Sequence, residues 1–139
     1  MKRKGKKMAG MILVIVMMMA MTVPAQAARS DSFITLYSGY YYSGTLDLTE
    51  SGAWRAVRAT VTSEAQISNE MSDSVSLHGP VFNSAGNTLD YLDAQKWAVS
   101  NVTSASDIVE NSNLQGAEVD YHAGYYLTST IVKTLSVSR

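Results

Sequence analysis

The 139-residue chain contains no cysteine, and this absence sets the first limits on its chemistry and its stability. Without thiols there is no disulfide, no thiolate ligand for zinc and no cysteine for lipid attachment after an apolar leader. Small exported domains often supplement a thin core with disulfides. This chain therefore has to rely on burial and hydrogen bonding alone.

Histidine is almost as scarce, since His78 and His122 are the only two. A three-histidine metal site is thereby excluded, and neither histidine has a second ligand at a diagnostic spacing such as H-x-x-x-H. We therefore expect no metal and no cofactor. The best catalytic pair is His122 with Asp120, which an extended strand places on one face. A solvated polar face explains the pair equally well, and we favour that explanation.

The common signatures of enzymes are also missing. No G-x-S-x-G elbow, calcium loop or glycine-rich phosphate loop occurs, and S-x-x-K does not occur after residue 27. Asp90 and Asp93 are three residues apart, which on a strand places them on opposite faces. We predict that the protein is not an enzyme, with a small hydrolase as a lesser alternative.

What the chain does have begins with a basic and then apolar start. Five Lys or Arg residues lie within residues 2–7, an apolar run follows over residues 8–23, and small side chains stand at Ala25 and Ala27. These features predict a helical signal peptide over residues 1–27 that signal peptidase cleaves after Ala27, with Ala25 and Ala28 as neighbouring cleavage positions. The 16-residue run is shorter than the roughly 20 residues that span a membrane. An uncleaved anchor is the alternative.

Cleavage changes the charge of the protein. Residues 28–139 contain six basic and twelve acidic side chains, a net charge of −6. No basic stripe remains to displace counterions from phosphates, so we expect no nucleic-acid partner. The same charge disfavours attachment to anionic membranes. We predict a secreted, extracellular protein with no stable membrane association after cleavage.

The rest of the chain is expected to be a flexible leader over residues 28–32 and a single β-rich domain over residues 33–139. Seven or eight short segments rich in β-branched and aromatic residues are separated by polar turns, which predicts an all-β fold. We expect a small antiparallel β-sandwich, with a small barrel as the alternative. Residues 104–116 are dominated by Ser, Asn, Asp and Glu, and we interpret them as a connection with at most one helical turn.

Three local patterns sharpen this expectation. In the clearest strand, over residues 53–62, Val57, Ala59 and Val61 share one face and should point inward, with Trp54 on the outer face or at the sheet edge. Residues 81–91 flank a polar turn and predict a hairpin. Pro80 has no N–H to donate, so we expect an edge position or a bulge there.

Aromatic residues are the most distinctive feature. Three consecutive tyrosines on a strand cannot all face inward, so at least one should be exposed and offer a flat amphipathic surface. A half-buried, tyrosine-rich sheet face is the alternative. The residues that we expect to bind a ligand are Tyr40, Tyr41, Tyr42, Trp54, Tyr125 and Tyr126.

These features favour a secreted protein with a non-catalytic binding role, whose partner is an extracellular protein or a glycan. The first alternative is a secreted antagonistic, bacteriocin-like protein that acts on neighbouring cells. The charge of −6 and the lack of a cationic amphipathic helix argue against direct membrane disruption. The hydrolase alternative requires His78 or His122 within hydrogen-bond reach of both a carboxylate and a serine.

Overall fold

The computed structural model describes residues 27–124 and 130–139, and in these residues it contains eight β-strands and no helix. The expected signal peptide up to residue 26, and Tyr125 and Tyr126, lie outside the described residues. The strands are β1 (Ala27–Tyr37), β2 (Tyr40–Ser51), β3 (Trp54–Ala65), β4 (Val75–Phe82), β5 (Thr88–Lys96), β6 (Val102–Glu110), β7 (Gly116–Ala123) and β8 (Thr130–Ser138).

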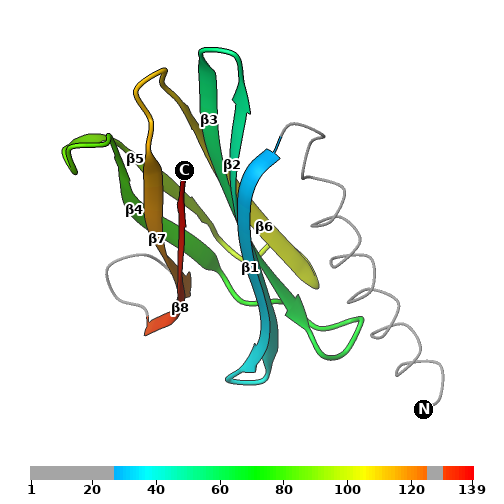
Figure 1. Cartoon of the computed structure of the whole chain (residues 1–139). Coiled ribbons are helices and arrows are strands. Elements are labelled where there is room, and N and C mark those ends of the chain that lie inside the picture. Colours follow the sequence, from blue (N-terminus) through cyan, green and yellow to red (C-terminus); the bar gives the residue numbers. More distant parts are fainter. Residues whose placement is uncertain (1–26, 125–129) are drawn as a thin grey trace.

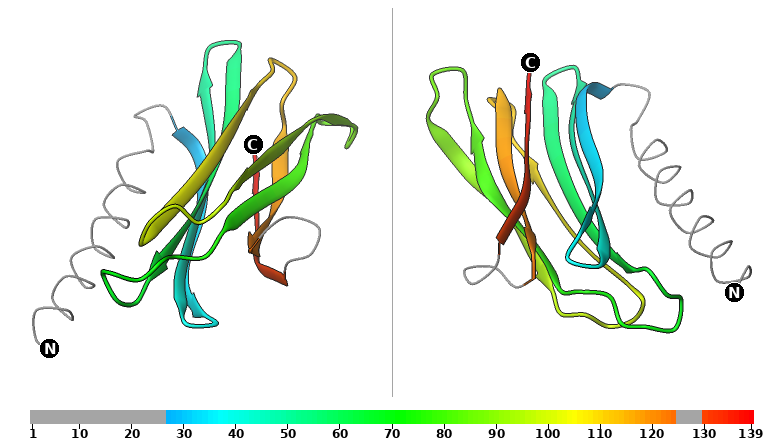
Figure 2. Two further views of the ribbon diagram at one scale, coloured as in Figure 1. Left: turned by 180° about the vertical axis from the view of Figure 1, so that it is seen from behind. Right: turned by 90° about the horizontal axis from the view of Figure 1, so that it is seen from below.

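The strands form two four-stranded antiparallel sheets that lie in two layers (Figures 1 and 2). Sheet A has the order β1-β2-β3-β6, and sheet B has the order β5-β4-β7-β8. No backbone ladder joins one sheet to the other in the described part of the chain. The prediction of an all-β antiparallel fold is confirmed.

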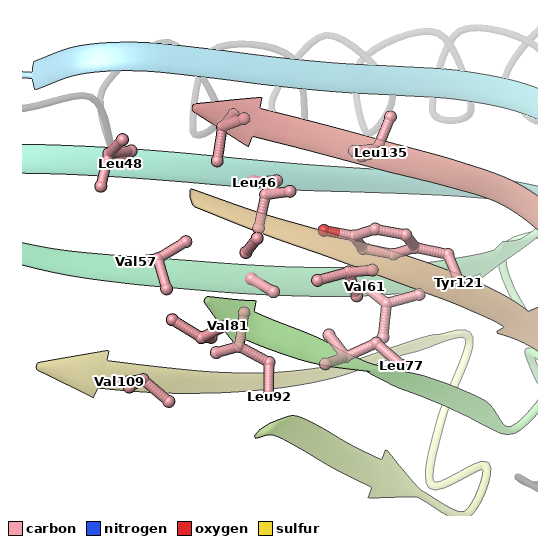
Figure 3. Packing of buried hydrophobic residues seen from close by; sticks show 14 of the residues in the cluster. Leu46, Leu48, Val57, Val61, Leu77, Val81, Leu92, Val109, Tyr121 and Leu135 are labelled. Carbon is pink, nitrogen blue, oxygen red and sulfur yellow. The ribbon is translucent and has the colours of Figure 1, made fainter. Parts of the chain in front are cut away.

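The hydrophobic core fills the space between the two sheets (Figure 3). Val57, Ala59 and Val61 of β3 are at most 1% exposed, so the predicted inward face of that strand is confirmed. Burying a valine or leucine side chain contributes about 1.5–3 kcal/mol. Without disulfides, this burial is the main source of stability. The largest aliphatic side chains in the core are Leu46, Leu48, Leu77, Leu92, Leu114 and Leu135.

Tyr121 connects the two sheets through the core. Its ring meets Phe33 of β1 edge-to-face at 5.4 Å, and its hydroxyl donates a hydrogen bond of 2.5 Å to the carbonyl oxygen of Thr45. Gly44 leaves room for both rings, because a Cβ there would lie 2.5 Å from Phe33 and 2.8 Å from Tyr121. Burial raises the pKa of the Tyr121 hydroxyl.

The segment expected to be a flexible leader belongs to the first strand. β1 starts at Ala27, and residues 29–32 pair with residues 45–48 of β2. The polar side chains that suggested mobility have partners in the fold: Ser30 Oγ donates to Asp47 Oδ1 at 2.6 Å, and the Ser136 N–H points to Asp31 Oδ2 at 3.4 Å. An edge strand tolerates such polar residues because only one of its faces is buried.

Residues 104–116, expected to be a connection, are mostly strand β6, which pairs with β3 along its length. The strand was missed because two of its inward positions are polar, Thr103 and Asp107, which hides the alternation that ends in buried Val109. The Asp107 carboxylate accepts a 2.9 Å hydrogen bond from the Asp93 N–H of β5. The inward-facing Asp107 side chain therefore links β6 of sheet A to β5 of sheet B.

Pro80 does not lie at a sheet edge, because β4 runs between β5 and β7. The ladder to β7 skips Gly79 and Pro80, since proline has no N–H to donate, and a bulge follows at Val81/Phe82 on the β5 side. A Cβ at Gly79 would lie 2.0 Å from the Glu118 carbonyl oxygen. The predicted hairpin is confirmed, because β4 and β5 pair across the turn of residues 83–87.

Candidate binding site

Loops from both sheets meet at one end of the molecule, which we call the braced end. It consists of the β1–β2 turn (residues 38–39), the β3–β4 loop (residues 66–74) and the β5–β6 loop (residues 97–101). Gln66 Nε2 donates to the Gly39 carbonyl at 2.8 Å, and the Ala98 N–H donates to Ser74 Oγ at 3.0 Å. The three segments are therefore joined by hydrogen bonds between residues far apart in the sequence.

Ser72 is the centre of this bracing. Its N–H and its hydroxyl both donate to the Ser100 carbonyl, at 2.8 and 2.7 Å, and its Oγ also lies 2.7 Å from Thr103 Oγ1. The Ala65 N–H donates to the Asn101 carbonyl at 2.9 Å. Since Ser72 and Thr103 are buried, water does not compete for these bonds. The bonds fix the two longer loops relative to each other.

Tyr42 contacts the braced end from the core side, through Asp73 of the β3–β4 loop. It is only 1% exposed, its hydroxyl donates to the Asp73 carboxylate, and its ring meets those of Tyr37 and Tyr40 edge-to-face at 6.2 and 6.4 Å. Burial, with the neighbouring Asp73 carboxylate, raises the pKa of the Tyr42 hydroxyl. The side chain belongs to the core, so Tyr42 offers no surface to a ligand, contrary to its place among the expected binding residues.

The other aromatic residues do not form the single surface suggested by the sequence. Tyr40 and Tyr41 are half-buried, and Trp54 is 45% exposed. The register pairs Tyr40 with Ala65 at one end of β2 and Ser51 with Trp54 at the other. At about 3.3 Å per residue, strand β2 separates these two places by roughly 35 Å. Trp54 is exposed, but it lies on the inner strand β3 and not at the sheet edge, at the end of β2 opposite the tyrosines.

Sequence reasoning missed the exposed apolar side chains of the braced end. Met71, Trp97 and Val99 are 55%, 64% and 57% exposed, and all three lie on the two cross-bonded loops. Met71 fits neither the helical nor the strand period, whereas Trp97 and Val99 alternate as they would on a strand. For Met71 a signal was present, because a segment without a clear period is often a loop, and loops carry many binding residues.

A shallow hollow lies between the same two loops, and we call it the loop hollow. Its volume is about 140 Å³. Apart from the Met71 thioether, its lining consists of hydroxyl, amide and carboxylate side chains. The lining residues are Ser68, Asn69, Glu70, Met71, Ser100 and Asn101.

The histidines lie elsewhere, on sheet B. The His78 ring stacks on Tyr91 at 5.3 Å, and its Nδ1 lies 3.8 Å from Asp93 Oδ1, beyond hydrogen-bond length. Asp120 accepts a 2.7 Å hydrogen bond from Thr134 Oγ1. The hydroxyl of Ser76, two residues before His78 on β4, donates to the Gly124 carbonyl at 3.1 Å. These contacts give the hydrolase alternative no support, and the absence of catalysis stays a prediction.

Two further properties bear on the site. Within residues 27–124 and 130–139, no group of three or more His, Cys, Asp or Glu side chains is arranged to hold a metal ion. Over the same residues, no helix has the length and apolar character needed to cross a membrane. Neither observation identifies a ligand for the loop hollow.

Comparison with known proteins gives no relative from which to transfer a function. No protein-family model matches the chain, and no curated protein is significantly similar to it.

Proposed function

We propose that this protein is a secreted, non-catalytic binding protein and that the braced end is its binding surface. The observation that carries the proposal is the exposure of Met71, Trp97 and Val99 on two loops that are fixed by hydrogen bonds. Large apolar side chains on a surface cost solubility, and they occur together where a partner covers them. Tryptophan is also among the residues that contribute most to binding.

The bracing matters because binding orders the groups that it uses. Each immobilised side chain or loop lowers affinity by its lost conformational entropy. At the braced end, Ser72 and Ser74 already tie the β3–β4 loop to the β5–β6 loop. Less ordering is then required when a partner docks, so a small surface can bind usefully.

Export supports the same function. Cleavage after Ala27 by signal peptidase would remove only the first residue of β1, at the position of a register shift, and would leave the two sheets intact. The net charge of −6 over residues 28–139 keeps the domain apart from nucleic acids and anionic membranes. The remaining partners are an extracellular protein or a glycan.

The two tryptophans provide a matched test, because both are exposed and they lie at opposite ends of the molecule. The chain beginning at Ala28 would be immobilised and exposed to cell-wall material and culture proteins, with circular dichroism to confirm folding. We expect Trp97→Ala to reduce retention of the captured partner at least tenfold, and Trp54→Ala to leave it unchanged. Equal retention by the two variants would remove the braced end as the binding surface.

A further inference from the structure

We infer that the loop hollow is a subsite for one sugar ring without an acidic group, belonging to an extracellular glycan. This inference rests on the proposed function and names the class of ligand bound at the same end of the molecule.

The polar lining suits a sugar because each sugar hydroxyl both donates and accepts hydrogen bonds. The Asn69 amide offers donors and an acceptor together, the Ser68 hydroxyl offers both, and the Glu70 carboxylate accepts. No hydrogen bond to other described residues occupies the side chains of Ser68, Asn69 or Glu70. Ser100 contributes less, because its hydroxyl already donates to the Val102 carbonyl at 2.8 Å.

The apolar part of the lining suits the other side of a sugar ring. A pyranose has a face of C–H groups, which packs against polarizable or aromatic side chains. Met71 lines the loop hollow and is 55% exposed. Trp97 lies on the same loop as Ser100 and Asn101 and carries the most exposed of the large apolar side chains, at 64%.

The size of the loop hollow and the negative charge of the protein restrict the class of ligand further. The volume of about 140 Å³ is below the roughly 300–1,000 Å³ of pockets that enclose a drug-sized molecule, so the loop hollow admits one ring at the surface of a longer chain. Glu70 and the net charge of −6 over residues 28–139 oppose a carboxylated or phosphorylated sugar. We expect a dissociation constant on the order of 1 mM for one sugar ring.

The test is an array of immobilised neutral, amino and acidic oligosaccharides, probed with the whole chain. A double variant, Asn69→Ala with Glu70→Ala, removes two lining side chains. Ser112→Ala is the matched control, because Ser112 is exposed on the β6–β7 loop at the other end. We expect neutral or amino sugars to be bound, at least a tenfold loss in the double variant, and no change in the control.

Two results would overturn the inference: equal binding by the double variant and the parent, including no binding by either, or preference for the acidic sugars. These results are distinguishable from failure of the proposed function. If Trp97→Ala still abolishes capture of a partner while the array shows no binding, the braced end binds a protein and the sugar subsite is wrong. If Trp97→Ala leaves capture intact, the proposed function fails first.

Discussion

The two ends of this molecule are built from the same strands and differ in what they expose. The braced end presents Met71, Trp97 and Val99, and buried hydrogen bonds join its loops across long sequence separations. At the opposite end, Asn83 closes its own turn by accepting the N–H groups of Ala85 and Asn87, both at 3.0 Å. The loops of the braced end are held by hydrogen bonds between different loops, whereas the turn at residues 83–87 is held by hydrogen bonds within itself.

Charge separates the ends as well. Near Glu50 at the opposite end, the Arg55 side chain lies 3.7 Å from the Glu50 carboxylate and the Arg139 side chain contacts it, so three charged side chains cluster there. The loops of the braced end instead carry exposed apolar side chains. The same strands therefore end in loops of different character at the two ends, in their charged side chains and in the contacts that hold them.

The largest expected difference between the ends comes from truncating one aromatic side chain at each end to alanine. Tyr42→Ala removes a core ring under the braced end and should lower the free energy of unfolding by about 3–5 kcal/mol. Trp54→Ala, at the opposite end, should lower it by less than about 1 kcal/mol, because that ring is half in solvent. Urea denaturation of both variants measures the contrast. Similar losses would show that Trp54 also belongs to the core.

Unfolding at high pH should show whether the hydroxyl of Tyr42, next to the braced end, is kept from ionising as well as the hydroxyl of Tyr121 in the centre of the core. Both hydroxyls have folded pKa values raised by burial above the unfolded value of about 10. Stability is therefore intact below pH 10 and falls above it, because only the unfolded state ionises. Each tyrosine should lower the free energy of unfolding by about 1.4 kcal/mol per pH unit.

The control for this alkaline loss is the pair of phenylalanine variants. Tyr42→Phe and Tyr121→Phe should each roughly halve the slope of stability against pH above pH 10, whatever they cost at pH 7. Thermal unfolding at a series of pH values measures the slope. A slope that neither variant changes would assign the alkaline loss to other groups.

The smallest of these effects should come from the brace. Ser72→Ala takes a hydrogen-bond partner from the Ser100 carbonyl and from Thr103 Oγ1, and should cost about 1–3 kcal/mol. Ser112→Ala, in an exposed position of the opposite end, should stay within about 0.5 kcal/mol of the parent. Hydrogen exchange should also be faster at the amides of residues 97–101 in Ser72→Ala. Unchanged exchange there would mean that the loops are held by other contacts.

Local sequence patterns predicted the parts of the fold whose inward residues are apolar. The alternation of Val57, Ala59 and Val61 gave the correct buried face of β3, and the turn at residues 83–87 gave the hairpin of β4 and β5. The same reasoning failed for β6, where polar Asp107 occupies an inward position and bonds to the Asp93 N–H of the other sheet. Periodicity detects burial in an apolar core, and it does not detect polar groups satisfied across a seam.

The candidate site was harder to predict than the fold. Sequence composition drew attention to the tyrosines, yet Tyr42 is core and Trp54 lies at the far end of the same hairpin. Met71 and Trp97 are 26 positions apart in the sequence, and their loops are brought together by the pairing of β4 with β5 and of β3 with β6, and by the bonds of Ser72 and Ser74. The sequence around each residue gives no sign that the two loops lie close together.

By itself, the sequence determined that this is a cysteine-free chain with β-rich segments whose apolar positions alternate, because each residue's preference for burial and extended backbone is local. The tertiary structure alone decided which aromatic rings are buried, which polar residues join the two sheets, and which loops share one end. Those outcomes depend on strand order and register. They bring together side chains whose distance along the chain says nothing about their distance in space.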